Sequence, residues 1–434
     1  MTTTLLAAEQ ELSKQIGDYW SSTTTGAGST TTLVDSALLQ KVNDWVTDET
    51  WAFLIEEPSG DATIYDERKA TSLVASTGTL TTLAFAGTPG SGIDYEIHRL
   101  FSPSDKRRAL VAAARRVFPA CFQEVWNEEL VSGNWLKDGS FERWTISTNP
   151  TDWTDTTVTA TQTTGAGYFV HGATSCKLSG ASGTLVQEWK AGTAEFEDLK
   201  HLRGKSVTFT LRAWCDTASS LRISINDGTQ TFSSYHSGNS AYTADNAPLS
   251  VSAGISSTAA QVTFTIHYTT GAIAYIDDGR VMAGNRSRLY IGHLGLALNR
   301  PHQVLIEPSN YSQDEDWLKI RDYKIDKDGY LYLPTTVPND YRLRIRGIGY
   351  LDFLASGASS TAWTATIAID QPQLEILVAE AALYLYTTLA LPNFETGTTN
   401  DYKQMIGYWQ QEVETRKNKF GMKSPSATTH WGIG

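Results

Sequence analysis

Cysteine is scarce in this chain, whose 434 residues include only Cys121, Cys176 and Cys215. The three are widely spaced and no CxxC pair occurs, which argues against a zinc knuckle, a redox pair and a disulfide framework. We expect all three thiols to be reduced and buried, as is usual in a protein made in the cytosol.

Basic residues are also in the minority, with 35 Lys and Arg against 47 Asp and Glu and a net charge of −12. A protein that wraps a phosphate backbone needs clustered Lys and Arg. One expected helix carries Lys106, Arg107 and Arg108 with Arg115 and Arg116. A solvated face or an inter-subunit salt bridge is preferred there over DNA contact. An acidic surface would instead suit a channel through which DNA slides without sticking.

The sequence also lacks signals for catalysis and for membrane insertion. The eight histidines stand singly, none at HxH or HExxH spacing, and no GxSxG motif occurs. The start has no basic stretch followed by a long apolar run, so it does not read as a signal peptide. The longest apolar run, residues 376–391, contains Glu380 and is too short and too polar to span a bilayer. We expect neither an enzyme nor a membrane protein.

Four segments have the apolar spacing of amphipathic helices: residues 3–17, 103–130, 372–390 and 400–420. Pro119 lies inside the second segment and is expected to kink or divide it. Each segment is too polar on its other face to be stable alone, so the apolar faces must bury against one another. The simplest arrangement is one helical bundle built from both ends of the chain.

The remaining segments are rich in Ser, Thr and Gly and predict short strands joined by turns. Residues 29–100 are expected to form a small, strongly bent β-domain. Residues 132–284 show many alternating strands and no convincing helix, which indicates an antiparallel sandwich. Strands recur between residues 303 and 368. The predicted fold class is therefore α+β and multidomain, with β-rich insertions and an inserted β-sandwich (jelly roll) in a helical bundle.

Three stretches resemble segments of neck and connector proteins of long-tailed phages. They read TTTLVDSALL, ASTGTLTTLAFAGTPGSGIDYEIHRLFSPSDKRRAL and DYKIDKDGYLYLPTTVPNDYRLRIRGIGYLDFL. With the four-helix plan, the chain is similar to the head-completion adaptor family over roughly residues 1–130 and 290–434. The resemblance implies that residues 1–131 and 285–434 are the two parts of one connector domain, into which residues 132–284 are inserted. The β-insertions depart from a minimal adaptor.

This resemblance implies a virion structural protein of a tailed phage, made in the cytoplasm of the bacterial host. The subunit would form a homo-oligomeric ring, a dodecamer, that links the portal protein to other neck or tail proteins. The ring would extend the channel through which DNA passes, without sequence-specific binding.

The chain ends with His430-Trp431-Gly432-Ile433-Gly434 after a Ser, Thr and Pro stretch that cannot form a core of its own. We interpret His430, Trp431 and Ile433 as a tail that docks onto the portal. Apolar side chains at the end of a tail are unfavourable in water and would be buried in a groove of a partner protein. The alternative is that the tail folds back onto its own subunit.

The central segment resembles carbohydrate-binding modules of the jelly-roll type. The resemblance is carried by NWLKDGSFERW at residues 134–144 and by AYIDD at residues 274–278. It implies a second function, that of a tail or baseplate protein that binds host glycans through residues 132–284. A glycan-cleaving enzyme with an appended binding module is a third and weaker possibility, because the flanking residues carry no signature of a catalytic cleft.

Aromatic residues of this segment are candidates for sugar binding. Trp189 and Trp214, with Tyr235, are the residues expected to stack on a glycan. Trp144 and Trp153 belong to the opening part that wraps the fold. Tryptophans of a sandwich are more often core residues than ligand contacts, so that alternative stays open.

Two carboxylates of the segment match positions that hold a structural calcium in the resembled modules. Glu142 lies on the first strand and Asp277 on the last, and these strands are neighbours in a jelly roll. Two carboxylates with backbone carbonyls can supply the oxygens that calcium needs. The alternative is that both are solvated, or paired with Arg143 or Arg280. No other cofactor is expected.

Overall fold

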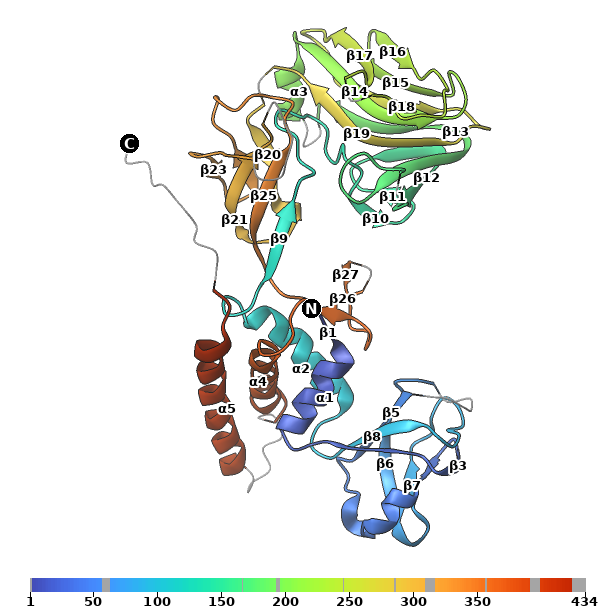
Figure 1. Cartoon of the computed structure of the whole chain (residues 1–434), viewed down its shortest axis with the longest axis vertical. Helices are drawn as coiled ribbons and strands as arrows, with labels where there is room; N and C mark the ends of the chain where they lie inside the picture. The colour runs from blue at the N-terminus through green and yellow to red at the C-terminus, as the bar shows by residue number, and fades with distance from the viewer. Residues whose placement is uncertain are drawn as a thin grey trace. The chain divides into compact units, whose positions relative to one another are not determined.

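In the computed structural model the chain divides into two compact units (Figure 1). The first, here called the terminal unit, extends to Gln123 and resumes at Gly349. The second, the central unit, spans Glu124–Ile348. The structure describes residues 2–56, 63–165, 167–192, 196–244, 246–284, 286–308, 317–355, 357–390 and 399–423.

Helices from both parts of the sequence lie together in the terminal unit (Figure 1). Their side chains share one hydrophobic cluster. Leu12, Ala113, Leu377 and Trp409, one from each helix, are all buried in it. All four segments expected to be helical therefore contain a helix. The bounds are α1 Leu5–Gln15, α2 Pro103–Arg116, α4 Leu374–Tyr384 and α5 Thr399–Phe420, with a π-helical continuation of α4 at Leu385–Ala390. No described helix is long and apolar enough to cross a membrane.

The first two helices begin at side-chain caps. Thr4 Oγ1 accepts the backbone N–H of Ala7 at 3.1 Å, and Ser102 Oγ accepts that of Asp105 at 3.0 Å. Pro103 occupies the first turn of α2, where a missing N–H costs no helical hydrogen bond. A cap of this kind contributes about 1 kcal/mol to stability.

The second helix is shorter than the sequence predicts. α2 ends at its cap residue Val117, and the chain returns as strand β9, Gln123–Asn127, where a helix was expected. Pro119 has no N–H for the helical ladder, and its ring disfavours helical geometry in Phe118. β9 pairs with β25, Leu343–Gly349, so long-range sheet hydrogen bonds override the local apolar spacing.

The predicted β-domain of the terminal unit is an antiparallel sheet that begins earlier than expected, at Trp20. Its order among the described residues is β2-β8-β5-β6-β7-β4-β3, around a core that includes Leu54, Leu80 and Tyr95. A smaller sheet has the order β1-β28-β26-β27. The bounds are β1 Thr3–Thr4, β2 Trp20–Thr23, β3 Gly26–Ser29, β4 Thr32–Val34, β5 Trp51–Glu56, β6 Glu67–Val74, β7 Thr79–Thr82, β8 Asp94–His98, β26 Leu354–Ala355, β27 Ala358–Ser359 and β28 Thr366–Ile367.

The predicted antiparallel sandwich is present in the central unit. Its order is β16-β15-β18-β13-β19-β14-β17, and β12 also pairs with β13. The long strand β13 belongs to both layers, because residues 183–190 pair with β18 and residues 176–178 pair with β19. The bounds are β12 Thr154–Thr163, β13 Ser175–Lys190, β14 Ser206–Cys215, β15 Leu221–Asn226, β16 Thr231–Tyr235, β17 Leu249–Gly254, β18 Gln261–Tyr268 and β19 Ala274–Met282.

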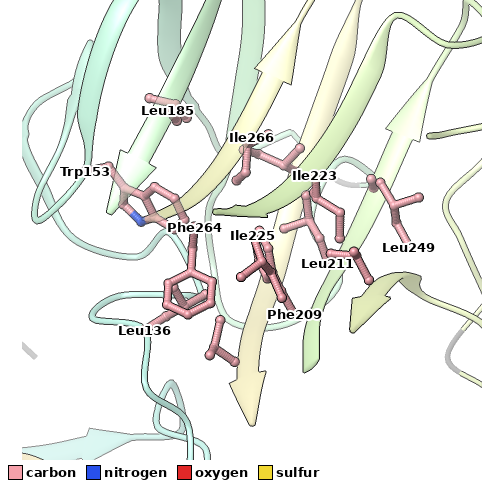
Figure 2. Close-up of a cluster of buried hydrophobic side chains, with 14 of the residues drawn as sticks. Leu136, Trp153, Leu185, Phe209, Leu211, Ile223, Ile225, Leu249, Phe264 and Ile266 are labelled. Atoms are coloured by element: carbon pink, nitrogen blue, oxygen red, sulfur yellow. The ribbon is translucent and has the colours of Figure 1, made fainter. Parts of the chain in front are cut away.

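Alternate residues of the sandwich strands point into one hydrophobic core (Figure 2). Phe209 and Leu211 of β14 meet Ile223 and Ile225 of β15 and Phe264 of β18 there. Burying a side chain of this size stabilises the fold by about 1.5–3 kcal/mol. Cys176 and Cys215 are also buried here and Cys121 is buried in the terminal unit, so the prediction of three free, buried thiols is confirmed.

One short helix interrupts the sandwich where none was expected. α3, Phe196–Leu202, lies between β13 and β14, and Leu199 and Leu202 are buried in the sandwich core. At two turns it is too short to show a helical period in the sequence. A two-stranded hairpin, β10 Trp144–Ile146 and β11 Asn149–Pro150, precedes the sandwich.

The strands between residues 286 and 348 belong to the central unit and not to the unit that contains α1, α2, α4 and α5. They form the sheets β20-β24-β23 and β22-β21-β25-β9 around a core that includes Val304, Leu331 and Ile345. The predicted domain boundaries at residues 131 and 284 stay predictions. The remaining bounds are β20 Arg288–Tyr290, β21 Leu296–Ile306, β22 Leu318–Lys319, β23 Lys324–Ile325 and β24 Tyr330–Tyr332.

Candidate functional site

The candidate site lies on the outer face of the sandwich layer that contains β14 and β19. Along β14, Leu211 and Ala213 are buried in the core, whereas the alternate residues Arg212 and Trp214 are half-buried. Since successive side chains of a strand point to opposite faces, Arg212 and Trp214 belong to the outer face. Trp214 is paired in register with Tyr275 of β19.

Four aromatic residues gather at this place, and we call them the aromatic platform: Tyr168, Trp214, Tyr242 and Tyr275. The rings of Tyr168 and Tyr275 are stacked, with centroids 4.3 Å apart and an interplanar angle of 29°. Trp214 meets Tyr275 edge-on at 5.4 Å. The Tyr242 hydroxyl donates to the Tyr168 carbonyl at 2.6 Å. Tyr168 is 42% exposed, so the platform is open to solvent on that side.

Two carboxylates hold the loop that carries Tyr168. Asp277 Oδ2 accepts the backbone N–H groups of Val170 at 2.6 Å and His171 at 3.1 Å. Glu142 Oε1 accepts those of Ala173 at 2.7 Å and Thr174 at 2.9 Å. Glu142 and Asp277 therefore anchor one loop. Asp277 lies on β19, the last strand of the sandwich, whereas Glu142, expected on the first strand, precedes β10.

These contacts do not fit a calcium site. Asp277 Oδ1 accepts the backbone N–H of Asp278 at 2.7 Å, whereas Glu142 Oε2 lies 3.3 Å from a Thr174 hydroxyl whose shorter bond, of 2.7 Å, goes to the Phe141 carbonyl. Three of the four carboxylate oxygens thus accept backbone N–H groups, whereas a calcium ligand must turn its lone pairs to the cation. The expected calcium at Glu142 and Asp277 stays a prediction. The two arginines that were the alternative partners of these carboxylates bind other acids: Arg143 binds Asp152 at 2.8 Å, and Arg280 binds Asp278 at 2.7 Å.

Charged groups lie beside the platform. Arg212 stands opposite Asp277 in the sheet register, and Lys177 of β13 stands opposite Tyr275. Burial raises the pKa of the Asp277 carboxyl to about 7. Burial also lowers the pKa of Arg212, against the attraction of Asp278. The face therefore combines aromatic rings with hydrogen-bonding groups in a partly desolvated setting.

The three residues predicted to stack on a sugar lie in three different places. Trp189 is 1% exposed and packs edge-on against Phe264 at 5.0 Å, so it is a core residue and the prediction for it is wrong. Tyr235 is 53% exposed but pairs with Arg222 on the outer face of the opposite layer. Trp214 alone of the three belongs to the platform.

The other platform residues were missed. Tyr275 lies in the closing string AYIDD, where only Asp277 was singled out. Its alternation with the core residues Ala274 and Ile276 is a signal that its ring lies on the outer face, although the ring is buried there. Tyr168 and Tyr242 lie in loops, where no spacing rule applies.

A second polar region, a cavity of about 220 Å³, lies beside the opening string of the sandwich. Two ion pairs line it: Arg143 with Asp152 at 2.8 Å, and Arg286 with Asp198 at 3.0 Å. Because both arginines already have partners, the cavity is a weaker candidate site than the platform. The predicted docking residues His430, Trp431 and Ile433 lie outside the described residues.

Comparisons with known proteins find no matching family model and no matching curated protein. Solved structures do match part of the chain. The enzymatically active domain of bacteriophage CBA120 tailspike protein 4 is 14% identical over 35% of this chain and 21% of its own, with a TM-score of 0.26. TmCBM61 in complex with β-1,4-galactotriose is 16% identical over 35% of this chain and 98% of its own, with a TM-score of 0.25.

The CBM22-1 xylan-binding domain from Paenibacillus barcinonensis Xyn10C is 11% identical over 38% of this chain and 99% of its own, with a TM-score of 0.26. Carbohydrate-binding modules and a phage tailspike domain are thus among the structures to which the chain is similar. TM-scores this low do not establish a shared fold, and the function proposed below rests on the contacts of the chain itself.

Proposed function

We propose that the chain binds a glycan through the aromatic platform of its sandwich. The observation that supports this most directly is the stack of Tyr168, which is 42% exposed, on the buried ring of Tyr275, with Trp214 edge-on to Tyr275. A pyranose ring has apolar C–H faces that pack on aromatic rings, and its hydroxyl groups need nearby hydrogen-bonding partners. Arg212 and Lys177, next to the platform, supply donors of that kind.

The loop anchors favour the same function. A binding surface loses less entropy when its side chains are held in place before the ligand arrives. Asp277 and Glu142 hold the loop of Tyr168 through four backbone N–H groups. The platform is therefore preorganised, which is what a binding module without catalytic chemistry requires.

A glycan array probed with the full chain tests this proposal, followed by calorimetry on the best ligand. Trp214→Ala and Tyr168→Ala should each weaken binding by about 2 kcal/mol, roughly thirtyfold in Kd. Tyr235→Ala is the matched control, because Tyr235 is an exposed aromatic on the opposite layer of the same sandwich. Binding that survives both platform variants, or a wild-type chain that binds no glycan, would reject the proposal.

We propose as a second candidate that the terminal unit makes the chain a ring-forming adaptor at the neck of a tailed phage. The observation that favours it is the hydrophobic cluster shared by α1, α2, α4 and α5, which joins both parts of the sequence as a connector bundle would. In this proposal the subunits form a dodecameric ring in the virion, contact the portal and tail proteins, and let DNA pass without binding it specifically.

Electron microscopy of the purified chain and of the virion tests the adaptor function. Rings with a central hole, located under the head, would support it, whereas labelling at the tail tip would favour the glycan-binding role alone. Truncation after Met422 removes His430, Trp431 and Ile433. If these residues dock onto the portal, the truncated chain should stay folded and fail to join portal rings. Undiminished assembly would reject the docking role.

A further inference from the structure

We propose that Glu9, Glu96 and His98 form a buried site for a divalent transition-metal cation, with Zn²⁺ as the probe ion. Glu9 lies on α1, and Glu96 and His98 lie two residues apart on β8. Residues at i and i+2 of a strand share a face, so both β8 side chains point away from the core residues Tyr95 and Ile97. This site is independent of the glycan-binding platform.

The three side chains have the spacing of metal ligands. One ligand atom of each lies within 4.8 Å of the others. His98 Nε2 is 3.3 Å from Glu96 Oε2. Ligands of a tetrahedral zinc ion are roughly 3.3 Å apart, as follows from zinc–ligand distances of about 2.0–2.1 Å. Imidazole nitrogen with carboxylate oxygen is a donor set that zinc accepts.

The atoms that would bind the metal have no hydrogen-bond partner. Glu9 Oε2, Glu96 Oε2 and His98 Nε2 are all unsatisfied, and the three residues are at most 1% exposed. The other oxygen of each carboxylate is held in place: Ser13 Oγ–H donates to Glu9 Oε1 at 2.6 Å, and Gln10 Nε2–H donates to Glu96 Oε1 at 2.7 Å. Unpaired buried polar atoms are costly, and a shared cation would satisfy all three.

The tautomer of His98 can match this arrangement. Its Nδ1 is 3.1 Å from the backbone carbonyl of Asp18. A proton on Nδ1 that is donated to this carbonyl leaves the lone pair of Nε2 for a metal, which is the usual orientation of a ligating imidazole. Lys106 Nζ can then donate to Ser13 Oγ at 2.8 Å and to Asp18 Oδ2 at 2.9 Å.

The charges around His98 also favour a cation. Among the described side chains in contact here, Glu9, Glu96 and Asp18 are acidic, and Lys106 pairs with Glu9 and Asp18. With His98 counted as neutral, three carboxylates and one ammonium give these groups a formal charge of −2. Buried charge must be compensated, and one divalent cation does so.

The competing arrangement is a network that shares protons and holds no metal. Lys106 Nζ lies 2.7 Å from His98 Nδ1 and can donate to it. The imidazole proton then sits on Nε2 and faces Glu96 Oε2. In that case the imidazole N–H and the Lys106 ammonium face the carboxylates, and no metal ion is bound. The two arrangements differ in whether the purified chain binds a metal ion.

Metal analysis of the untagged full chain distinguishes them. We expect about one divalent transition-metal ion per chain after purification. After chelator treatment, Zn²⁺ at a hundredfold excess over its Kd should raise the melting temperature of the terminal unit by roughly 5–10 °C. Glu96→Gln should abolish both effects, and Glu9→Gln provides a second variant if the first does not fold.

Glu67→Gln is the matched control, because Glu67 is a carboxylate of the same unit whose Oε2 already accepts the N–H and hydroxyl of Ser104. It should keep the metal content and the zinc-dependent shift. A chain that purifies without metal and does not respond to Zn²⁺ would overturn the proposal in favour of the proton-sharing network. Metal binding that persists in both Glu96→Gln and Glu9→Gln would overturn it as well.

Discussion

The carboxylate of Asp277 accepts the backbone N–H of Val170 at 2.6 Å, and this bond ties the last strand of the sandwich to the loop of Tyr168. Asp277 is fully buried, so the bond is shielded from water. The relationship explains how a buried carboxylate next to the core supports the aromatic platform.

Replacement of Asp277 by alanine should both destabilise the sandwich and weaken glycan binding. The N–H groups of Val170 and His171 would lose their partner, which costs about 1–3 kcal/mol for each group left unsatisfied. Chemical denaturation of the full chain measures the loss. Asp155→Ala, at an exposed position of β12, is the control and should change stability by less than about 0.5 kcal/mol. Equal stability of the two variants would contradict the anchoring role.

The stability of the central unit should fall as the pH rises. The pKa of Asp277 is raised by burial to about 7, from an ordinary value near 4 in an unfolded chain. The folded state thus holds the proton more tightly, so this contribution is complete below about pH 4 and is lost as the pH rises through about 7. Calorimetric melting between pH 5 and pH 8 should show the decline.

Asp277→Asn should flatten that decline, because the amide cannot ionise. Burial raises the pKa of Asp138 to about 8, so part of the slope should remain in the variant. Asp155→Asn should keep the wild-type slope. A melting temperature that is constant between pH 5 and pH 8 in the wild type would show that the Asp277 carboxyl does not titrate in this range.

Added calcium should leave the melting temperature of the central unit unchanged. Three of the four oxygens of Glu142 and Asp277 accept backbone N–H groups, whose partial positive charge repels a cation. Calorimetry with and without millimolar Ca²⁺ checks this. A calcium-dependent rise that is lost in Glu142→Ala would instead establish the structural calcium predicted from the sequence.

Truncation of Trp189 should affect stability without any direct effect on ligand binding. Trp189→Ala removes a fully buried ring and should cost about 3–5 kcal/mol. Trp189→Phe keeps a ring against Phe264 and should cost less, leaving a folded chain for the binding assay. The affinity of Trp189→Phe for the best glycan should match the wild type. A tenfold loss would place Trp189 at the ligand after all.

Much of the fold could be predicted because its signals are local. The alternation of Val207, Phe209 and Leu211 indicates a half-buried strand by itself, and Ser102 with Pro103 marks a helix start. The end of α2 could not be predicted from such signals. The strand β9 gains its hydrogen bonds from β25, a partner distant in the sequence, and only the folded chain brings the two together.

The candidate sites were harder to predict because they depend on which face a residue occupies. Trp189 and Trp214 look alike in the sequence, yet one fills the core and the other lies on the outer face. The Glu-x-His pair at Glu96 and His98 places two metal-binding groups on one side of a strand. The HxH motif requires two histidines and therefore does not include this pair. Its third member, Glu9, comes from a different element.

Lys106 and Arg108 show how differently two bases of one helix contribute. Both were expected on a solvated face or in an inter-subunit salt bridge. Lys106 is instead fully buried and binds Asp18 at 2.9 Å, whereas the Arg108 side chain is 63% exposed and binds Asp105 at 3.4 Å. Lys106→Met leaves the Asp18 carboxylate without its ammonium partner in the interior. Loss of one member of a buried pair costs about 3–5 kcal/mol, whereas an exposed pair contributes about 0–1 kcal/mol.

Chemical denaturation of the full chain should therefore show a large loss for Lys106→Met and almost none for Arg108→Met. The backbone N–H groups of Leu100 and Phe101 also bind Asp18, so they moderate the loss but cannot replace a full positive charge. The comparison is internal to one helix, which removes differences in helix propensity between the two sites. If Lys106→Met were as stable as Arg108→Met, the buried pair would not stabilise the terminal unit.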